Sequence, residues 1–434
     1  MQPTSRRSAK TPSLARHGRL RRSAAWKTVL KGVAAAAAVV FVSGGAVAAY
    51  AAWDLAASAQ PTVTLDSEKV LEGVPDVGAI EGGVNLLVIG SDSRQGQGNG
   101  FGDPDEDTAV LNDVTMLLHI AEDHSHVEVV SFPRDMYVSV PGTCTDPADP
   151  SEELSALSSV KLNSVLSYGG MDCVVKTVEE LTGVTIPFAG IVQFMGVAGL
   201  SEAVGGVEVC VAEPIEDEYT DLNLSAGMHE LAGLEALQFL RTRHGVGDGS
   251  DLGRISNQQV FLSALARKLQ SDGTLGDPVK LYSIAKVALA NMQLSSSLTD
   301  PTRMISIAKA MKDVDLSKIA FIQYPTGYMD DGVVPAESAE LVNQALQNDE
   351  PITFDPNADQ TDFASAADPN APAASSAPNA DVAAQGDSSD APADGESSDA
   401  PVESTPPPGS LPGDVTGQTA DEVRCSAGRT LADQ

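Results

Sequence analysis

Residues 85–94 read NLLVIGSDSR, an apolar run that is closed by Gly90 and followed by a polar turn. A short continuous apolar run that ends in glycine is typical of a strand buried on both faces. The turn that follows carries Asp92 and Arg94. We therefore expect a central strand that presents charged side chains at its carboxyl end.

Further runs of this kind alternate with helical patterns along the chain. Strands are predicted at 114–120, 127–132, 207–211 and 319–324, and helices at 160–168, 171–182, 233–240, 255–269, 278–292 and 300–311. Asp277 and Pro278 are the residue types preferred at an N-cap and at a first helical position. Alternating strands and helices indicate an α/β layer structure.

The chain of 434 residues carries a net charge of −33, which argues against nucleic acid as a partner. Residues 1–31 are the exception, with nine basic residues and no acid. An uncharged apolar run at 32–53 follows, long enough to span a bilayer. A basic flank before the span and an acidic body after it predict a cytoplasmic N-terminus. A cleaved signal peptide is the alternative, because Ala-x-Ala sites lie around 46–52.

The remaining chain divides by composition. Residues 54–83 are predicted to be an extracellular stalk, and 84–353 have the size of one large domain. Residues 354–413 are rich in Ala, Pro, Ser and Asp and cannot bury enough apolar surface to fold. We expect them to be a disordered acidic linker that leads to a C-terminal tail at 414–434.

Four cysteines fit an extracellular location, where an even count suggests two disulfides. Three connectivities are open for Cys144, Cys173, Cys210 and Cys425. The first two form the most local pair. A bond from the domain to Cys425 would close the acidic tail into a loop.

Arginines are scarce in the acidic region 32–354, and five of its seven follow strands or lie next to helix ends: Arg94, Arg134, Arg241, Arg243 and Arg254. Ligands usually bind at strand ends on one edge of an α/β sheet. Planar guanidinium groups gathered there suit phosphate. The alternative is that each arginine forms a surface salt bridge with a neighbouring aspartate, a contact worth little.

Acidic residues accompany these arginines. Asp92 follows the first strand and Asp113 precedes the second, so two carboxylates beside a phosphate site predict a hard divalent cation, Mg²⁺ or Mn²⁺. Asp251 lies three residues before Arg254, and Gln258 lies four residues after it, on the same helical face. Other chemistries lack their motifs: the chain has no GxxxxGK[ST] loop and no GxSxG elbow with a fitting histidine, and its six histidines lack metal-ligand spacing.

Together these segments resemble the LytR-CpsA-Psr family of bacterial cell-envelope enzymes. The matching segments, in family order, are NLLVIGSDSR (85–94), NDVTMLLHI (112–120), SFPRDMYVSVP (131–141), KLNSVLSYGG (161–170), GGVEVCV (205–211) and ALQFLRTRHGVGDGSDLGRISNQQ (236–259). The paired cysteines and the acidic tail are similar to those of actinobacterial members. The resemblance implies an α-β-α fold whose central mixed sheet is flanked by helices, with an apolar pocket for a lipid tail.

The resemblance also implies residue roles. Asp92 and Asp113 would hold Mg²⁺, and the pyrophosphate would be clamped by Arg134, Arg241, Arg243 and Arg254, with Arg94 supporting them and Gln258 assisting. Asp251 would orient Arg254 or take the acceptor proton. Many relatives place an arginine two residues before the second metal aspartate, where this chain has Leu111.

The implied activity is Mg-dependent transfer of a glycopolymer phosphoglycosyl group. The donor would be a polyprenyl (pyro)phosphate carrier, and the acceptor a hydroxyl of peptidoglycan or of a surface protein. The enzyme would be a single-pass membrane protein with its catalytic domain outside the cell. Two alternatives remain open: a polyprenyl-pyrophosphate hydrolase and a non-catalytic regulator that only binds lipid-linked phosphate.

Overall fold

The computed structural model describes residues 25–58, 60–74, 80, 82–94, 97, 110–271, 273–354, 364–366 and 411–434. The chain forms two units, which divide after Ala57. Residues 1–24 of the expected cytoplasmic segment and nearly all of the expected linker lie outside the described residues. The domain boundaries read from the sequence therefore stay predictions.

The first unit contains one long helix, α1 (Ala25–Ser58). Its stretch Trp26–Leu55 is long and apolar enough to cross a membrane, by length and composition. Large apolar side chains such as Phe41 and Val40 are exposed along it. The helix contains the predicted span 32–53 and extends beyond it at both ends. It is consistent with a single-pass anchor.

The second unit is built on a seven-stranded mixed sheet with the order β11-β6-β1-β2-β3-β12-β16. Its strands are β1 (Val84–Ser91), β2 (Asn112–Ile120), β3 (Val127–Phe132), β6 (Phe188–Val192), β11 (Met292–Leu294), β12 (Ile319–Gln323) and β16 (Gly417–Thr419). Strand β1 runs parallel to β6 and antiparallel to β2, and β3 runs parallel to β12. The α/β class and the central mixed sheet are thus confirmed.

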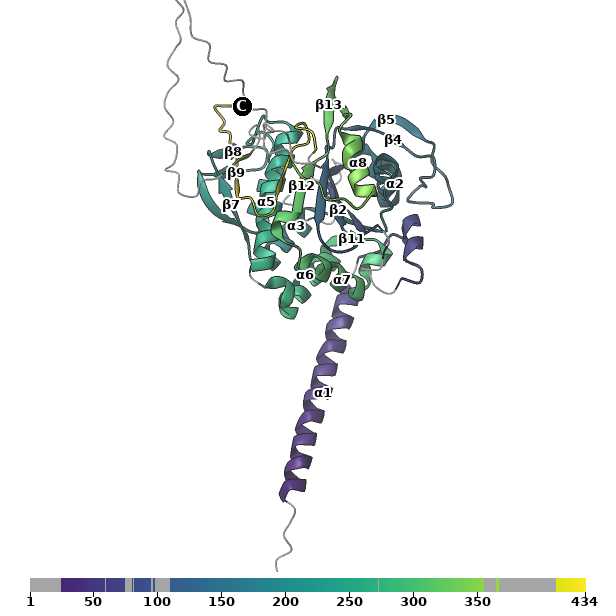
Figure 1. The fold of residues 1–434 in the computed structure, drawn as a ribbon, viewed down its shortest axis with the longest axis vertical. Coiled ribbons are helices and arrows are strands. Elements are labelled where there is room, and N and C mark those ends of the chain that lie inside the picture. Colours follow the sequence, from purple (N-terminus) through teal and green to yellow (C-terminus); the bar gives the residue numbers. More distant parts are fainter. Residues whose placement is uncertain are drawn as a thin grey trace, which may run out of the picture. The chain divides into compact units, whose positions relative to one another are not determined.

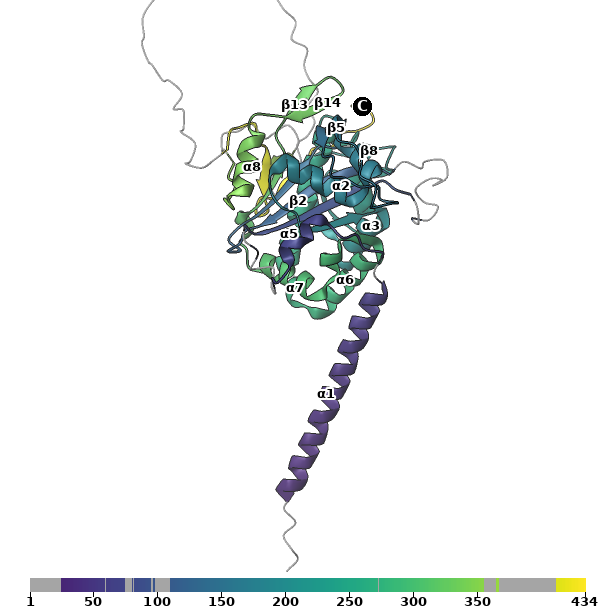
Figure 2. The same cartoon turned by 90° about the vertical axis from the view of Figure 1, so that its right-hand side faces the viewer.

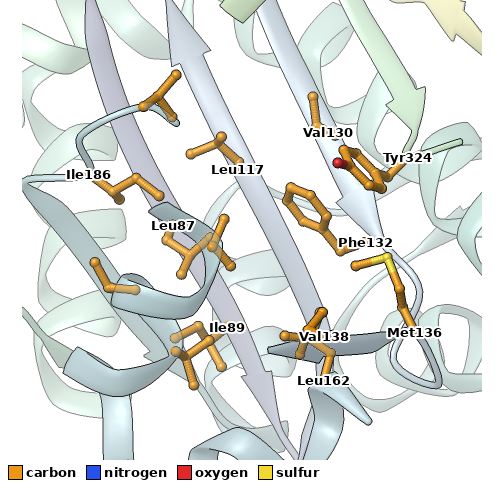
Figure 3. Close-up of a cluster of buried hydrophobic side chains, with 14 of the residues drawn as sticks. Leu87, Ile89, Leu117, Val130, Phe132, Met136, Val138, Leu162, Ile186 and Tyr324 are labelled. Atoms are coloured by element: carbon orange, nitrogen blue, oxygen red, sulfur yellow. The ribbon is translucent and has the colours of Figure 1, made fainter. Parts of the chain in front are cut away.

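One face of the sheet is covered by α2 (Val165–Thr182) and α8 (Ala339–Gln347), which lie together on one side of β2 (Figure 1). Leu87, Ile89 and Leu117 project from the strands into this layer, and their side chains are fully buried. Figure 3 shows them beside Phe132 from β3. We call this the filled face, because its side chains form a continuous hydrophobic core.

The opposite face is covered by three helices: α3 (Phe194–Ala203), α4 (Gly233–Arg241) and α5 (Asp251–Ser271). Behind α5 lies a second sheet, ordered β10-β7-β17-β15, with strands β7 (Val207–Val211), β10 (Gly227–Leu231), β15 (Ala364–Ala366) and β17 (Arg424–Ser426). Val209, Phe239 and Phe261 belong to a separate core between this sheet and the helices. Figure 2 views the second unit from the side of the filled face, where α2 lies in front of the central strands.

The other elements are shorter or peripheral. They are β4 (Tyr137–Val140) with β5 (Leu157–Lys161), β8 (Ile215–Asp217) with β9 (Leu222–Leu224), β13 (Thr326–Met329) with β14 (Gly332–Pro335), and the helices α6 (Pro278–Asn291) and α7 (Pro301–Lys312). Asp277 caps α6, because its side chain accepts the N–H groups of Val279 and Lys280. The cap expected from the sequence is confirmed.

The two helices predicted at 160–168 and 171–182 are in fact one kinked helix that begins later. Residues 160 and 161 belong to β5, and α2 runs from Val165 through a kink at Gly169 and Gly170. Gly170 has a φ of 68°, a conformation that glycine adopts without steric cost. The sequence pattern placed a break at this point, but the chain resumes the same helix after it.

Parts of the predicted stalk and tail pack on this unit. Leu65 is buried in the core of the filled face, and the 3₁₀ helix Asp66–Leu71 is tied to α2 by a 2.7 Å ion pair between Asp66 and Lys176. The disulfides join Cys144 to Cys173 and Cys210 to Cys425. This is the arrangement that closes the acidic tail into a loop.

Candidate anion site at the mouth of an apolar cavity

Strand direction brings the predicted site residues to one edge of the central sheet. Strands β1 and β3 both end there, and β2 begins there because it is antiparallel to each. Asp92 follows β1, Asp113 lies at the start of β2, and Arg134 follows β3. The edge predicted from the sequence therefore exists.

Arg134 is the most extensively paired of the arginines. Its Nη1 donates to Asp113 Oδ1 at 2.6 Å, and its backbone N–H donates to Asp251 Oδ2 at 3.0 Å. Burial acts to lower the pKa of Arg134, but Asp113 and the other acids outweigh it, so the pKa is raised. Arg134 is fixed as a permanent cation beside the start of β2.

Arg241 and Arg243 come from the end of α4 and the loop after it. The guanidinium of Arg241 lies 4.2 Å from the ring centroid of Phe194. Arg241 as a whole is nevertheless exposed to solvent. The backbone N–H of Arg243 donates to Asp217 Oδ2 at 3.3 Å. Burial lowers the pKa of Arg243, and the positive charges of Arg134 and Arg254 lower it further.

Arg254 lies in the first turn of α5. Its side chain is almost fully buried and contacts Asp251 Oδ1 at 2.5 Å. Its Nη2 also donates to the backbone carbonyl of Asp113 at 2.6 Å, which joins α5 to β2. Gln258, one turn further along, donates to the carbonyl of Leu240 at 3.0 Å. The predicted helical face is confirmed, and its polar groups anchor neighbouring elements.

Three of these guanidinium groups retain unused donors. Within the described part of the chain, the buried Nε atoms of Arg134, Arg243 and Arg254 have no hydrogen-bond partner. A buried donor without an acceptor costs free energy. At Arg243 the positive charges of Arg134 and Arg254 add to that cost. An anion bound among these groups would lower both costs. The arrangement can therefore bind phosphate oxygens.

Behind the arginines, between the sheet and the helices, is a cavity of about 350 Å³. Most of its wall is apolar, from residues that include Val88, Val114, Met116, Val192, Phe194, Val197, Leu237, Leu240 and Leu262. Its polar wall contains Asp113, Arg134, Arg241, Arg243, Arg254 and Gln258. Gly90 also lines it, and a side chain there would come within 2.8 Å of Val114. The site thus joins a charged mouth to an apolar interior.

Two predicted site residues lie beside this cavity without lining it. Asp92 accepts the backbone N–H of Leu111 at 2.7 Å, and its charge acts to raise the pKa of Arg241. The positive charge of Arg94 acts to lower the pKa of Arg241. Leu111, where the family resemblance implies an arginine, thus helps to hold Asp92 through its backbone.

The carboxylates fit the metal that the family resemblance implies. Among the described residues, no three His, Cys, Asp or Glu side chains gather into a metal cage. Mg²⁺ is commonly held by one or two carboxylates together with water and substrate phosphate. Asp92 and Asp113 at one sheet edge, beside the arginines, would supply such a donor set.

Two parts of the site were not predicted from sequence patterns. The first is Asp217, whose buried carboxylate accepts the hydroxyl of Thr242 at 2.6 Å and anchors the loop of Arg243. Tyr219, Thr220 and His244 line the cavity nearby. Of these residues, only His244 could have been suspected from the sequence, because it directly follows Arg243.

The second missed part is the C-terminal segment 411–434. The Arg429 N–H donates to the Gly245 carbonyl at 2.8 Å, and the Gly247 N–H donates to the Ala427 carbonyl at 3.0 Å. Ser426 contacts Asn257 of α5, and β17 pairs with β7 beside the Cys210–Cys425 disulfide. This segment therefore braces the loop that connects Arg243 to Arg254.

The fold and site define an α/β protein that can hold an anionic group at the mouth of an apolar cavity. A family model described as the LytR_cpsA_psr family matches residues 50–350, well over half of the chain. The chain belongs to the LytR-CpsA-Psr family.

Individual relatives come from several bacteria. The probable cell wall biosynthesis protein LcpB of Corynebacterium glutamicum is 35% identical over 217 residues, which are 48% of this chain and 47% of LcpB. The cell wall biosynthesis protein LcpA of the same organism is 32% identical over 236 residues, 49% of this chain and 45% of LcpA. The chain thus spans about half the length of these two relatives.

The polyisoprenyl-teichoic acid–peptidoglycan teichoic acid transferase TagT of Bacillus subtilis is 25% identical over 331 residues, 74% of this chain and 95% of TagT. Among solved structures, a LytR-Csp2A-Psr enzyme from Actinomyces oris is 20% identical with a TM-score of 0.49, and covers 67% of this chain and 95% of its own.

Proposed function

We propose that this protein transfers a phosphoglycosyl group from a polyprenyl pyrophosphate carrier to a hydroxyl of peptidoglycan or of a surface protein. The observation that carries the proposal is the set of buried, unpartnered guanidinium donors at the mouth of an apolar cavity. Those donors suit a pyrophosphate, and the apolar interior suits the first isoprene units of a lipid. TagT, a family relative, bears the name of a transferase of this kind.

In the proposed reaction, the acceptor hydroxyl attacks the phosphorus that bears the glycan. A new P–O bond forms to the acceptor, the P–O bond to the carrier breaks, and polyprenyl phosphate leaves as the acceptor loses its proton. Arg134, Arg243 and Arg254 neutralise charge on the phosphate oxygens, where preorganised donors act most strongly. A Mg²⁺ or Mn²⁺ ion held by Asp92 and Asp113 would supply further neutralisation.

The contacts of Asp251 favour one of the two roles considered for it. One carboxylate oxygen faces Arg254 and the other accepts the backbone N–H of Arg134. A carboxylate engaged on both oxygens is suited to orienting arginines. Asp251 is therefore proposed to position the clamp, and removal of its charge would leave Arg254 buried without its partner.

The anchor completes the proposal. Helix α1 would span the membrane once, with the basic segment 1–31 in the cytoplasm and the catalytic domain outside. A permanent anchor would confine the protein to the membrane that contains its lipid-linked donor. The proposed acceptors, peptidoglycan and surface proteins, lie on the outer side of that membrane.

The test is transfer by the purified full chain from a synthetic polyprenyl-pyrophosphate glycan, with Mg²⁺ and a glycan acceptor. Arg243→Ala is expected to lower the rate at least about 100-fold, the usual cost of one catalytic donor. Arg303→Ala, on α7 away from the cavity, is the matched control and should retain wild-type activity. Circular dichroism melting would show that both variants fold.

The product identifies the reaction. Glycan joined to the acceptor supports transfer, and released phosphoglycan without acceptor linkage would instead indicate a hydrolase. Binding of the lipid without turnover would indicate a non-catalytic receptor. Full activity of Arg243→Ala would contradict the proposed clamp.

A further inference from the structure

An aromatic pair lies at the mouth of the cavity, beside the arginines. The ring of Tyr219 rests against the imidazole of His244, with centroids 4.6 Å apart and planes tilted by 38°. Both residues line the cavity together with Arg243. Tyr219 is nevertheless 79% exposed. A large ring held in water at the entrance of a binding site is available to a ligand.

The position of this ring is fixed by a buried carboxylate. Asp217 Oδ1 accepts the backbone N–H of Tyr219 at 2.9 Å, and Asp217 Oδ2 accepts the hydroxyl of Thr242 and the N–H of Arg243. Asp217 ends β8, which pairs with β9, so Tyr219 lies in the tight connection between these strands. One carboxylate thus sets the place of the ring relative to the arginine clamp.

A hydroxyl beside the ring is available as well. Thr220 lines the same cavity, and its Oγ1 is buried with no hydrogen-bond partner among the residues described by the structure. A buried hydroxyl can both donate and accept, and leaving it unpaired costs free energy. A polar ligand group is the partner that would satisfy it from the cavity side.

We propose that Tyr219 and His244 form a stacking platform for the sugar attached to the pyrophosphate of the donor, with Thr220 bonding one of its hydroxyls. This inference rests on the proposed function. The apolar cavity would take the isoprene units, and the arginines would take the phosphates. The part of the ligand that extends past Arg243 toward solvent is then the first sugar. The C–H face of a pyranose packs on aromatic rings while its hydroxyls stay in water or bond to polar groups.

The experiment compares two ligands that differ only in the sugar. A short-chain polyprenyl pyrophosphate and the same molecule with one N-acetylhexosamine would be titrated into the full chain, with calorimetry as the readout. Wild type is expected to bind the sugar-bearing ligand more tightly. Tyr219→Ala should lose about tenfold in affinity for that ligand, the scale of one aromatic contact, and keep its affinity for the sugar-free one.

Two further variants sharpen the result. Tyr219→Phe keeps the ring and should retain the sugar preference. Tyr328→Ala removes a tyrosine that is equally exposed, at 80%, but lies on β13 and not at the cavity. It should bind both ligands as wild type does, which makes it the control for loss of an exposed ring.

The outcomes separate this inference from the proposed function. If wild type binds both ligands and Tyr219→Ala changes neither affinity, or weakens both equally, the platform is wrong while the pyrophosphate clamp stands. If wild type binds neither ligand, the proposed function fails and the platform fails with it. Loss of the sugar preference alone supports the platform.

Discussion

The same strands of the central sheet face two different environments. On β1, Leu87 and Ile89 point into the filled face and are completely buried against the layer of α2 and α8. Val88 and Gly90, their immediate neighbours, point the other way and line the cavity below α3, α4 and α5. One strand thus contributes to a packed core on one side and to an open site on the other.

The difference indicates that stability and the proposed ligand binding depend on separate faces of the sheet. A filled core gains dispersion contacts from every side chain, whereas a cavity forfeits them along its lining. Each face also has its own disulfide: Cys144–Cys173 lies in the core of the filled face, and Cys210–Cys425 lies in the sheet behind α5.

The largest effect is expected from the disulfides. Cys210→Ser/Cys425→Ser opens a link over 215 residues and should cost about 5 kcal/mol by the chain-entropy relation, whereas Cys144→Ser/Cys173→Ser opens 29 residues and should cost about 3.5 kcal/mol. Only the first should also reduce transfer by folded protein, because the tail braces the loop of Arg243. Urea unfolding and transfer rates measure the two effects. Equal loss of activity in both variants would show that the two faces are not separate.

The second test uses neighbours on β2. Leu117 is fully buried on the filled face, and Leu117→Ala should destabilise the protein by about 3 kcal/mol. Met116 lines the cavity, so Met116→Ala removes a side chain with fewer packed neighbours and should cost about 2 kcal/mol, the low end for such substitutions. Denaturant melts give both values. Similar costs would mean that the cavity side is packed as tightly as the core.

The third test fills each face. Val88→Phe extends a ring into the cavity and should weaken binding of polyprenyl pyrophosphate at least about tenfold with little change in melting temperature. Leu87→Phe overpacks the filled face and should cost about 1–3 kcal/mol of stability while folded protein still binds lipid. Calorimetry and thermal melts report the two properties. If each variant changed both lipid affinity and melting temperature, the two faces would not have separate roles.

The smallest effect concerns pH on the filled-face side of β2. Burial lowers the pKa of His119 below 6.5, against the opposing charges of Glu128 and Asp349. The folded protein therefore binds fewer protons there than the unfolded chain, so stability is complete above pH 6.5 and falls as the pH drops toward the folded pKa. His119→Gln should lose this acid-side decline, measured as unfolding free energy at pH 7.5 and 5.5.

His126 supplies the matched control because its shift has the other sign. Burial acts to lower its pKa, but Glu128 outweighs burial and the pKa is raised. His126 therefore adds to the free energy of unfolding below pH 6.5, and this stabilisation is lost as the pH rises through the folded pKa. His126→Gln removes that stabilisation at low pH, so it should keep the acid-side decline and make it steeper than in wild type. If it removed that decline instead, the assignment to His119 would be wrong.

Much of the fold and of the charged site could be predicted because local patterns determine it. The apolar run ending at Gly90 marks β1, and the positions of Asp113 and Arg134 relative to their strands place them at one edge. The Asp277 cap follows from residue type alone. These features depend on a few neighbouring residues, so one sequence is enough to infer them.

The cavity and the packing of the tail could not be predicted in this way. An apolar residue such as Val88 is expected to be buried in either case, so the sequence does not show whether it contacts packed side chains or lines a cavity. The pairing of β17 with β7 depends on contacts across more than 200 residues, and the Ala/Pro/Ser linker between them carries no signal of it. Asp217 was missed for a similar reason, since its role arises from a loop that the fold brings to it.

The contribution of residues 417–426 to two sheets also has a consequence for the order of synthesis. A ribosome makes residues 84–354 before these exist, so β12 first forms with an open edge where β16 later pairs. During that interval the loop of Gly245 and Gly247 has no backbone partners from residues 427 and 429. The loop between Arg243 and Arg254 therefore gains these two backbone contacts only after residue 429 has been made, well after the strands that carry the rest of the site.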